Sequence, residues 1–402
     1  MAKSSSASAP EINSKAALEL VMEMIAIPGK SCEEGRVVEY IRKRLKDAEI
    51  PDSAVINDYT PKRSPAGGEI GNLIVRLPGT RRGPRRLLMG HIDTVPLCVG
   101  AQPVRRGAFI ESREAHTALG GDNRAGASVV LNAVLEIKRQ NLPHPPLTLF
   151  WPVQEEIGLF GVRYVSKNKI GQPKLCFNWD GKEPNLAVIG ATGDYNIEIE
   201  IEGIASHAGG HPEQGVSAIG IAGLAIADLI EHGWHGLIIK GRNAGTSNIG
   251  IISGGDATNV VTPKLSVHGE ARSHDPKFRK RIVKAFRQAF EKAAKTLKND
   301  AGKTGRVHFK ADSKYDSFQL AQDEPCVQSA LAAVEAVGLT GGTCISNGGL
   351  DANWMTVHGF PTATLGCGQH KIHTANETLH VPSFLKACRI GLMLATGTEP
   401  ET

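Results

Sequence analysis

Residues 86–93 read Arg-Leu-Leu-Met-Gly-His-Ile-Asp, an apolar run that passes through a glycine into a histidine and an aspartate. The arrangement returns twice, because residues 147–153 lead into a pair of glutamates and residues 174–178 lead into Asp180. Helical patterns separate these runs, and such alternation is typical of an α/β sheet covered by helices. Since open α/β sheets place their sites at the carboxyl ends of the strands, the sequence predicts that these polar side chains meet at one edge.

Two further segments supply side chains of the same kind, Gly-Gly-Asp-Asn at residues 120–123 and His-Thr-Ala-Asn-Glu at residues 373–377. We interpret each of these, too, as following an apolar run at the end of a buried strand. One such group alone is more often a turn or a surface residue, but five converging segments favour a zinc-like divalent metal site. The candidate side chains are His91, Asp122, the pair Glu155 and Glu156, Asp180 and His373.

The spacing within these segments assigns different tasks to their residues. His91 and Asp93 are two residues apart, so on an extended strand they share a face and Asp93 can orient the imidazole. Glu155 and Glu156 are adjacent and point apart in extended backbone, so one can bind metal while the other acts as a base. With Asp122 as a bridge, five groups supply three ligands to each of two ions and leave positions open for water and substrate.

The hydrophobic pattern changes near residue 193, because residues 195–202 alternate strictly between apolar and polar. That pattern is typical of an antiparallel strand with one wet face, unlike the fully apolar strands before it. We therefore predict an α/β domain at residues 11–192 and 319–402, with an α+β domain inserted at residues 193–318. Residues 1–10 are rich in Ser and Ala, and we expect a disordered tail there and no signal peptide.

Periodicity and capping signals predict the individual elements. A helix at residues 16–27 precedes a second helix that Ser31 caps, with Glu34 completing a capping box. Further helices are expected at residues 124–140, at 212–230, from Pro276 with Asp275 as its cap, and after Asp323. Further strands are expected at residues 72–77, 247–252, 264–272, 306–311, 342–345 and 362–365.

The bulk composition excludes several classes of protein. There are 46 basic and 41 acidic residues among 402, and a net charge of +5 argues against nucleic-acid binding. The seven cysteines are scattered singly, which favours reduced thiols in a cytoplasmic protein. The longest apolar stretch, residues 216–230, contains Asp228 and is too short to cross a membrane. It is more apolar than one buried helix face needs, so it either packs on the inserted sheet or forms a homodimer interface.

Together these segments resemble the zinc-dependent exopeptidase superfamily of peptidase T, aminoacylase, glutamate carboxypeptidase and succinyl-diaminopimelate desuccinylase. The resemblance covers nearly the whole chain after the tail. The aspartate at position 180 and the stretch Asn-Gly-Gly-Leu-Asp-Ala-Asn at residues 347–353 are similar to the peptidase T (tripeptide aminopeptidase) branch. The other matching stretches are residues 90–96, 120–126, 155–156, 206–209 with Pro212 and Gly215, 257–260 with Pro263, 269–272, and 372–374 with Glu377.

The resemblance implies a fold and a ligand set. The fold is a catalytic domain with a mixed sheet flanked by helices, carrying an inserted lid and dimerisation domain. Two zinc ions per subunit are implied, and cobalt or manganese would suit the same ligands. One ion is held by His91, Asp122 and Asp180, and the other by Asp122, Glu156 and His373, which is thereby preferred over the nearby His370.

The resemblance also implies roles around the metal ions. Glu155 is the general base for the attacking water, and it passes the proton on to the leaving amine. Asp93 forms a hydrogen bond with the imidazole of His91 and fixes the orientation of its ring. In the lid domain, His207 stabilises the oxyanion, usually from the partner subunit of a homodimer. Asn259 and Arg272 hold a substrate carboxylate or carbonyl.

The favoured function is a peptidase T-like aminopeptidase that hydrolyses short peptides with water activated between two zinc ions. An N-acyl amino acid deacylase or a carboxypeptidase of the same superfamily is the alternative among hydrolases, and a requirement for a free amine separates the two. A catalytically inactive metal-binding regulator is a third hypothesis, which the presence of Glu155 and all the ligands argues against. Nucleic-acid and membrane partners are not expected.

Overall fold

The computed structural model of the chain describes residues 10–400, so residues 1–9 of the predicted tail lie outside the described part. The chain forms two compact units. The first unit comprises residues 10–190, 319–346 and 350–400. The second comprises residues 191–318 and 347–349, and we call it the inserted unit. The sequence-based boundaries of the lid, residues 193–318, leave residues 347–349 in the first unit, whereas in the structure these residues cluster with the inserted one.

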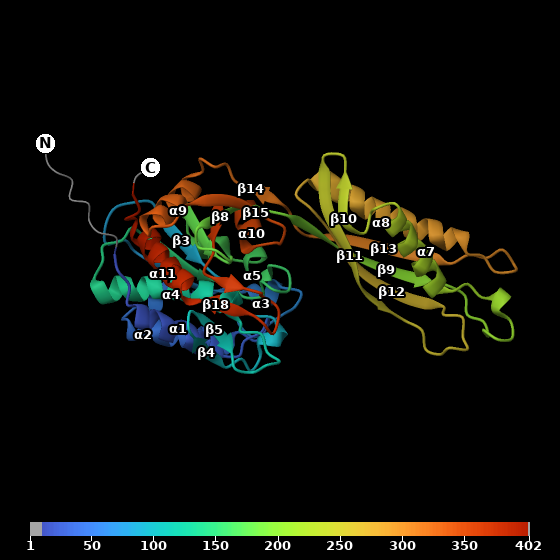
Figure 1. Cartoon of the computed structure of the whole chain (residues 1–402), viewed down its shortest axis with the longest axis horizontal. Coiled ribbons are helices and arrows are strands. Elements are labelled where there is room, and N and C mark those ends of the chain that lie inside the picture. Colours follow the sequence, from blue (N-terminus) through green and yellow to red (C-terminus); the bar gives the residue numbers. More distant parts are fainter. Residues whose placement is uncertain (1–9, 401–402) are drawn as a thin grey trace. The chain divides into compact units, whose positions relative to one another are not determined.

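A nine-stranded mixed sheet forms the centre of the first unit (Figure 1). Its parallel neighbours are β6 (Leu147–Trp151), β3 (Arg86–Met89), β7 (Leu175–Trp179) and β16 (Thr362–Leu365). Every residue of these four strands is buried, as expected when helices cover both faces of a parallel sheet. The remaining strands are β1 (Val55–Asn57), β2 (Leu73–Leu77), β8 (Leu186–Ala191), β14 (Phe318–Gln319) and β15 (Gly342–Ser346).

Helices pack against this sheet and against one another. Helices α1 (Ser14–Ala26), α4 (Gly121–Gln140) and α11 (Val381–Thr396) form one group, and α4 and α11 both contact β3. Helix α9 (Pro325–Ala336) contacts β7 and β16, and α10 (Asp351–Val357) contacts β16. The other helices are α2 (Gly35–Asp47), α3 (Thr60–Arg63), α5 (Phe160–Arg163), α6 (Lys167–Ile170) and the short 3-10 turns Asp52–Ala54 and Pro96–Cys98.

A small four-stranded sheet, which the sequence analysis did not predict, joins two distant segments of the first unit. Strands β4 (Pro103–Arg106) and β5 (Phe109–Ser112) come from one segment, and β17 (Gln369–His370) and β18 (Thr378–His380) come from the other. The order is β17-β18-β5-β4, with antiparallel pairing throughout. The sheet fixes both ends of the loop that carries His373.

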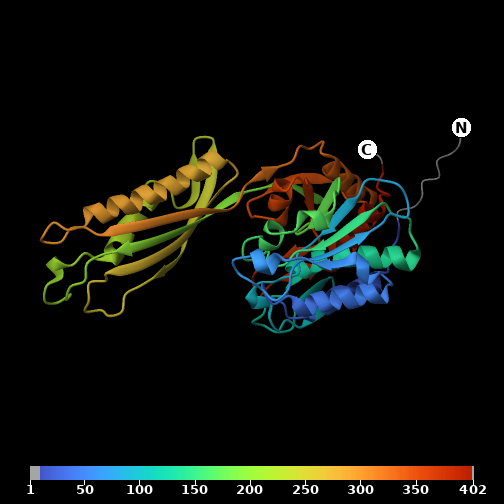
Figure 2. The same ribbon diagram turned by 180° about the vertical axis from the view of Figure 1, so that it is seen from behind.

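The inserted unit is a five-stranded antiparallel sheet of order β10-β11-β12-β9-β13. Strand β9 (Gly193–Glu202) contains the period-two pattern, and its Ile197, Ile199 and Ile201 are buried as that pattern predicts. These residues pack against α7 (Ala218–Glu231) and α8 (Pro276–Thr296), which lies along the sheet (Figure 2). The other strands are β10 (Gly236–Lys240), β11 (Asn243–Ser253), β12 (Lys264–Ser273) and β13 (Arg306–Tyr315).

Two predictions about helix starts are wrong. Helix α2 begins at Gly35 without a side-chain cap, because Ser31 donates to Asp93 and Glu34 accepts from the backbone of Cys32 and Gln154. The site therefore uses the side chains that were expected to form a capping box.

The second error concerns the helix predicted from residue 212. Residues Pro212–Gln214 form a separate 3-10 turn, and α7 begins at Ala218 with Ser217 as its cap. Val216 lies between this turn and the helix, and its backbone both donates to and accepts from the backbone of Ile204. This pairing holds Val216 in an extended conformation, so the helix starts after it.

The predicted start of α8 is confirmed. Asp275 caps α8 by accepting from the backbone of Lys277 and Phe278. All seven cysteines are free thiols. Among residues 10–400, no helix combines the length and the hydropathy that a membrane span requires.

Candidate metal centre

Three of the five predicted groups lie at one edge of the main sheet. His91 follows β3, Glu155 and Glu156 follow β6, and Asp180 follows β7, and these strands run parallel. For Asp122 the prediction of a preceding strand is wrong, and for His373 the preceding strand, β17, belongs to the small sheet rather than to the main one. Asp122 lies in the first turn of α4, because the apolar run ahead of it is too short for a strand. His373 lies in the loop between β17 and β18.

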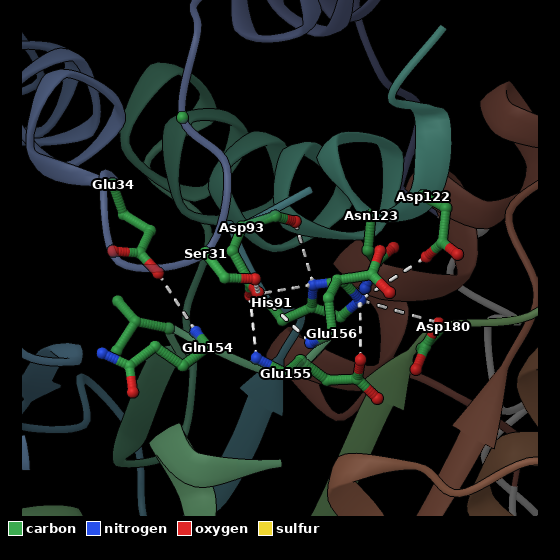
Figure 3. Close-up of polar contacts among 12 residues, drawn as sticks. Ser31, Glu34, His91, Asp93, Asp122, Asn123, Gln154, Glu155, Glu156 and Asp180 are labelled. Carbon is green, nitrogen blue, oxygen red and sulfur yellow. Dashed lines mark hydrogen bonds and ion pairs between the residues drawn. The ribbon is translucent and has the colours of Figure 1, made fainter. Parts of the chain in front are cut away.

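The first cluster of ligand-type atoms is formed by His91, Asp122 and Asp180. The Nε2 atom of His91 lies 3.5 Å from Oδ1 of Asp122 and 3.9 Å from Oδ1 of Asp180. All three side chains are nearly inaccessible to solvent (Figure 3). Their donor atoms lie within 4.8 Å of one another, so a single ion can contact all three.

The second cluster is formed by Asp122, Glu156 and His373. The Nε2 atom of His373 lies 3.2 Å from Oδ2 of Asp122 and 3.0 Å from Oε2 of Glu156. Asp122 thus presents one carboxylate oxygen to each cluster, which is the geometry of a bridging ligand. His370, the competing histidine of the sequence analysis, instead lies 3.8 Å from Glu183.

Asp93 holds three neighbours of the site in place (Figure 3). Its carboxylate accepts hydrogen bonds from the backbone of Glu155 at 3.0 Å and of Glu156 at 3.2 Å, and from the Ser31 hydroxyl at 2.6 Å. Its Oδ1 also lies 3.3 Å from Nδ1 of His91, on the side of the ring away from the other ligands. One buried carboxylate therefore orients the imidazole and positions both glutamates.

Glu377 plays the same part for the bridging aspartate. Its buried carboxylate accepts from the backbone N–H of Gly120 at 2.8 Å and of Asp122 at 2.9 Å. These bonds fix the Gly-Gly-Asp turn and hence the direction of the Asp122 side chain. The sequence analysis gave Glu377 no role, although the residue is part of the segment 373–377 and of the resemblance to the exopeptidase superfamily.

Glu155 belongs to neither cluster but lies beside His91 of the first. Its Oε2 lies 4.0 Å from Nε2 of His91, and only 11% of its side chain is exposed. Burial raises its pKa well above the usual range, and the nearby carboxylates of Asp180, Asp351 and Glu156 act in the same direction. The residue before it, Gln154, has a φ of 58°, a left-handed backbone conformation that turns the chain at this point.

The other carboxylates and the imidazole titrate in a strongly coupled environment. Hydrogen bonds that His373 donates to the carboxylates of Asp122 and Glu156 raise the pKa of its imidazole to about 10. Burial alone would raise the pKa of Asp122, but hydrogen bonds from His373 and His91 prevail and lower it. Burial, followed by the charge of Asp122, raises the pKa of Asp180 to about 7. Such shifts are what closely spaced ligands show when no cation shares their charge.

The donor set fits two divalent ions. Two imidazole nitrogens and three carboxylates are ligands that zinc accepts, and Oδ1 of Asp122 is buried with no hydrogen-bond partner within residues 10–400. His91, Asp122 and Asp180 can hold one ion, and Asp122, Glu156 and His373 can hold the other. Each ion then has three protein ligands and room for further ones.

The three lid residues of the sequence analysis all lie in the inserted unit. His207 and Asn259 are exposed neighbours, because Ala208 donates its backbone N–H to the Asn259 carbonyl. Nδ1 of His207 accepts from the backbone N–H groups of Gly209 and Gly210, so the neutral ring carries its proton on Nε2. Arg272 directs its guanidinium at the Glu270 carboxylate, with two hydrogen bonds of 2.8 and 2.9 Å.

Comparisons with known proteins agree with this geometry. The M20 family description "Peptidase dimerisation domain" matches residues 189–298. The uncharacterized protein YqjE of Bacillus subtilis is 30% identical over 382 residues, which cover 94% of this chain and 97% of that protein. Carboxypeptidase G2 of a Pseudomonas strain is 26% identical over 250 residues, which cover 60% of this chain and 55% of its own length.

Two solved structures resemble the whole chain. A tripeptidase from Staphylococcus aureus has a TM-score of 0.86 at 28% identity, with 98% of this chain and 100% of that chain covered. The aminopeptidase PepT from Bacillus cereus has a TM-score of 0.81 at 30% identity, with 97% and 100% covered. The fold and the paired ligand clusters define a metallopeptidase. The chain belongs to the M20 peptidase family, within which it is similar to the peptidase T branch.

Proposed function

We propose that this protein is an aminopeptidase that removes the N-terminal residue from short peptides, using two zinc ions. The observation that carries the proposal is the pair of ligand clusters that share Asp122, with Glu155 beside His91 and part of neither cluster. Metal ions bound there would polarise the scissile carbonyl and lower the pKa of the attacking water. Manganese or cobalt is compatible with the same ligands.

Glu155 acts as the general base in this proposal. Its carboxylate is within reach of the space between the clusters, and its raised pKa suits a group that takes a proton and then returns it to the leaving amine. Asp93 acts as a positioning residue, because it holds the backbone of both glutamates and the His91 ring. The surrounding burial excludes bulk water and strengthens each of these interactions.

The inserted unit would complete the site in a homodimer. His207 offers an Nε2–H donor for the oxyanion that forms on the scissile carbonyl, supplied by the partner subunit. Asn259 and Arg272 would bind a carbonyl or carboxylate of the peptide. Because Glu270 fills the guanidinium fork of Arg272, a substrate carboxylate would have to replace it there.

Helix α7 supports the homodimer. Three of its apolar side chains are exposed, Ile219 at 52%, Leu224 at 43% and Ile230 at 59%, while its other face packs on the inserted sheet. An exposed apolar stripe of this kind is typical of an interface. The free cysteines are compatible with the reducing cytoplasmic compartment that we propose for the protein.

Mass spectrometry of the products from an unblocked tripeptide tests the proposed activity on the zinc-loaded protein. We expect the free N-terminal residue and the remaining dipeptide. Release of the C-terminal residue would make the protein a carboxypeptidase, an activity named for several relatives of partial coverage. An intact tripeptide together with cleavage of an N-acyl amino acid would make it a deacylase.

A further inference from the structure

Gln154 lies between strand β6 and the two glutamates of the metal centre, and its backbone is left-handed. Its φ of 58° falls in a region that residues other than glycine rarely adopt. The next two residues are Glu155, the proposed base, and Glu156, a ligand of the second cluster. The direction in which both glutamates leave the sheet therefore depends on this one residue. Strained backbone of this kind persists only where the surrounding structure holds it.

The side chain of Gln154 is fully buried, and both atoms of its amide group are hydrogen-bonded. Its Oε1 accepts from the Ser64 hydroxyl at 2.6 Å, and its Nε2 donates to the Gly67 carbonyl at 2.7 Å. Because a carbonyl can only accept, the contact with Gly67 requires this orientation of the amide. The amide thus ties the turn before the glutamates to a segment that is distant in the sequence.

The main chain of Gln154 is held as well. Its N–H donates to Oε1 of the buried Glu34 at 3.2 Å, and its carbonyl accepts from the N–H of Phe160 at 3.0 Å. Hydrogen bonds from three separate segments of the chain therefore act on one residue. Together they hold the left-handed conformation against its intrinsic cost.

The part that Gln154 plays differs from that of Asp93. The Asp93 carboxylate accepts from the N–H groups of both glutamates after the turn, whereas Gln154 forms the turn itself. The segment around Ser64 also fits closely against the amide. A side-chain carbon added to Gly68 would lie 2.4 Å from Nε2 of Gln154, so the amide has no room to move in that direction.

We propose that Gln154 is a positioning residue, whose amide holds a left-handed turn and thereby sets the directions of Glu155 and Glu156. The inference rests on the proposed role of Glu155 as the general base and extends it to the residue that aims it. A displacement of about 1 Å in a reacting group costs on the order of 100-fold in rate. Loss of the amide contacts should consequently lower kcat and leave KM unchanged.

The test is a double-mutant cycle of Gln154→Ala and Ser64→Ala, with kcat measured on Leu-Gly-Gly for the zinc-loaded protein. We expect kcat to fall about 100-fold in Gln154→Ala and about 10-fold in Ser64→Ala. The double variant should be no slower than Gln154→Ala, because Ser64 reaches the turn through this amide. Gln154→Gly should be faster than Gln154→Ala, since glycine adopts the left-handed conformation without steric cost.

Gln140→Ala is the matched control. Gln140 is the last residue of α4, and its side-chain nitrogen donates to the Glu11 carbonyl at 2.8 Å and to Glu136 at 2.6 Å. The control thus also removes a glutamine with two hydrogen bonds, and it should keep the wild-type kcat.

Zinc affinity, measured by competition with a chelator, provides a readout that does not depend on turnover. One ion should bind more weakly in Gln154→Ala and the other as in the wild type, because Glu156 belongs only to the second cluster. The effects of Gln154→Ala and Ser64→Ala on this affinity should again be non-additive.

Three results would overturn the assignment of Gln154. The first is additive effects of the two substitutions, and the second is a glycine variant no faster than the alanine variant. The third is an equal loss for both ions that follows a lower melting temperature, since Gln154 would then only stabilise the fold. A wild type that cleaves no unblocked tripeptide contradicts the proposed function instead, and the zinc-affinity cycle then decides the role of Gln154.

Discussion

Replacement of Glu377 by alanine tests whether the Gly-Gly-Asp turn must be held for metal to bind. The Glu377 carboxylate accepts two backbone hydrogen bonds of 2.8 and 2.9 Å, one from Gly120 and one from Asp122 itself. Hydrogen bonds to a charged group contribute about 1.5–3 kcal/mol each, so their joint loss amounts to about 3–6 kcal/mol. If about 4 kcal/mol of this stabilisation is lost from the metal-bound state relative to the metal-free state, zinc affinity falls about 1000-fold. Each 1.4 kcal/mol of binding free energy corresponds to a factor of about ten in affinity.

The loss should affect both ions, because Asp122 faces both ligand clusters. Glu377→Gln keeps one acceptor oxygen and should lose about half of the free energy. Zinc affinity is measured by competition with a chromogenic chelator at pH 8, above the pKa of about 7 to which burial raises Glu377. Glu111→Ala in β5, whose carboxylate pairs with Arg106 at the surface, is the matched control and should bind zinc as the wild type does. Wild-type zinc affinity in Glu377→Ala would refute the reasoning.

Three further outcomes are expected. Glu155→Gln should lower kcat by about 100- to 10,000-fold while both zinc ions stay bound, whereas Glu156→Gln should lose zinc as well; wild-type turnover in Glu155→Gln would exclude it as the base. Leu224→Glu should turn the homodimer into a monomer in analytical ultracentrifugation, and a wild type that is already monomeric would contradict the interface. Burial raises the pKa of Glu34 from 4.5 to about 8, so its ionisation weakens the fold as the pH rises through that window. Glu34→Gln should therefore gain unfolding free energy relative to the wild type by up to about 1.4 kcal/mol per pH unit between pH 5 and 8, and a constant difference would contradict this.

The parts of the fold that follow a regular hydrophobic pattern could be predicted from the sequence. Strands β3, β6 and β7 were recognisable because every one of their residues is buried, and β9 because its isoleucines alternate with polar residues. The small sheet of β4, β5, β17 and β18 could not be predicted, because its strands are two to four residues long and its central pair, β5 and β18, joins two segments that are far apart in the sequence. Short strands of this kind depend on tertiary pairing rather than on local preference.

The site was predictable in its ligand types and in the support of His91 by Asp93, but not in its other supports. Metal-binding residues can be recognised by their residue type and by their position after apolar runs, as His91 and Asp180 can. Glu377 holds its ligand by accepting backbone N–H groups. Every residue except proline has such a group, so the sequence does not indicate this contact. Ser31 and Glu34 illustrate the difficulty, because they match a helix cap in sequence while their side chains bond to Asp93 and Gln154.

The sharing of Asp122 by two ions is the central claim, and zinc counting by plasma mass spectrometry after equilibrium dialysis tests it most directly. The wild type should retain two zinc ions per chain, and His373→Ala should retain one, because His373 belongs only to the second cluster. Asp122→Ala should retain neither ion tightly. An Asp122→Ala protein that still binds one zinc ion with wild-type affinity would show that the two clusters do not depend on a common ligand, and would contradict the account.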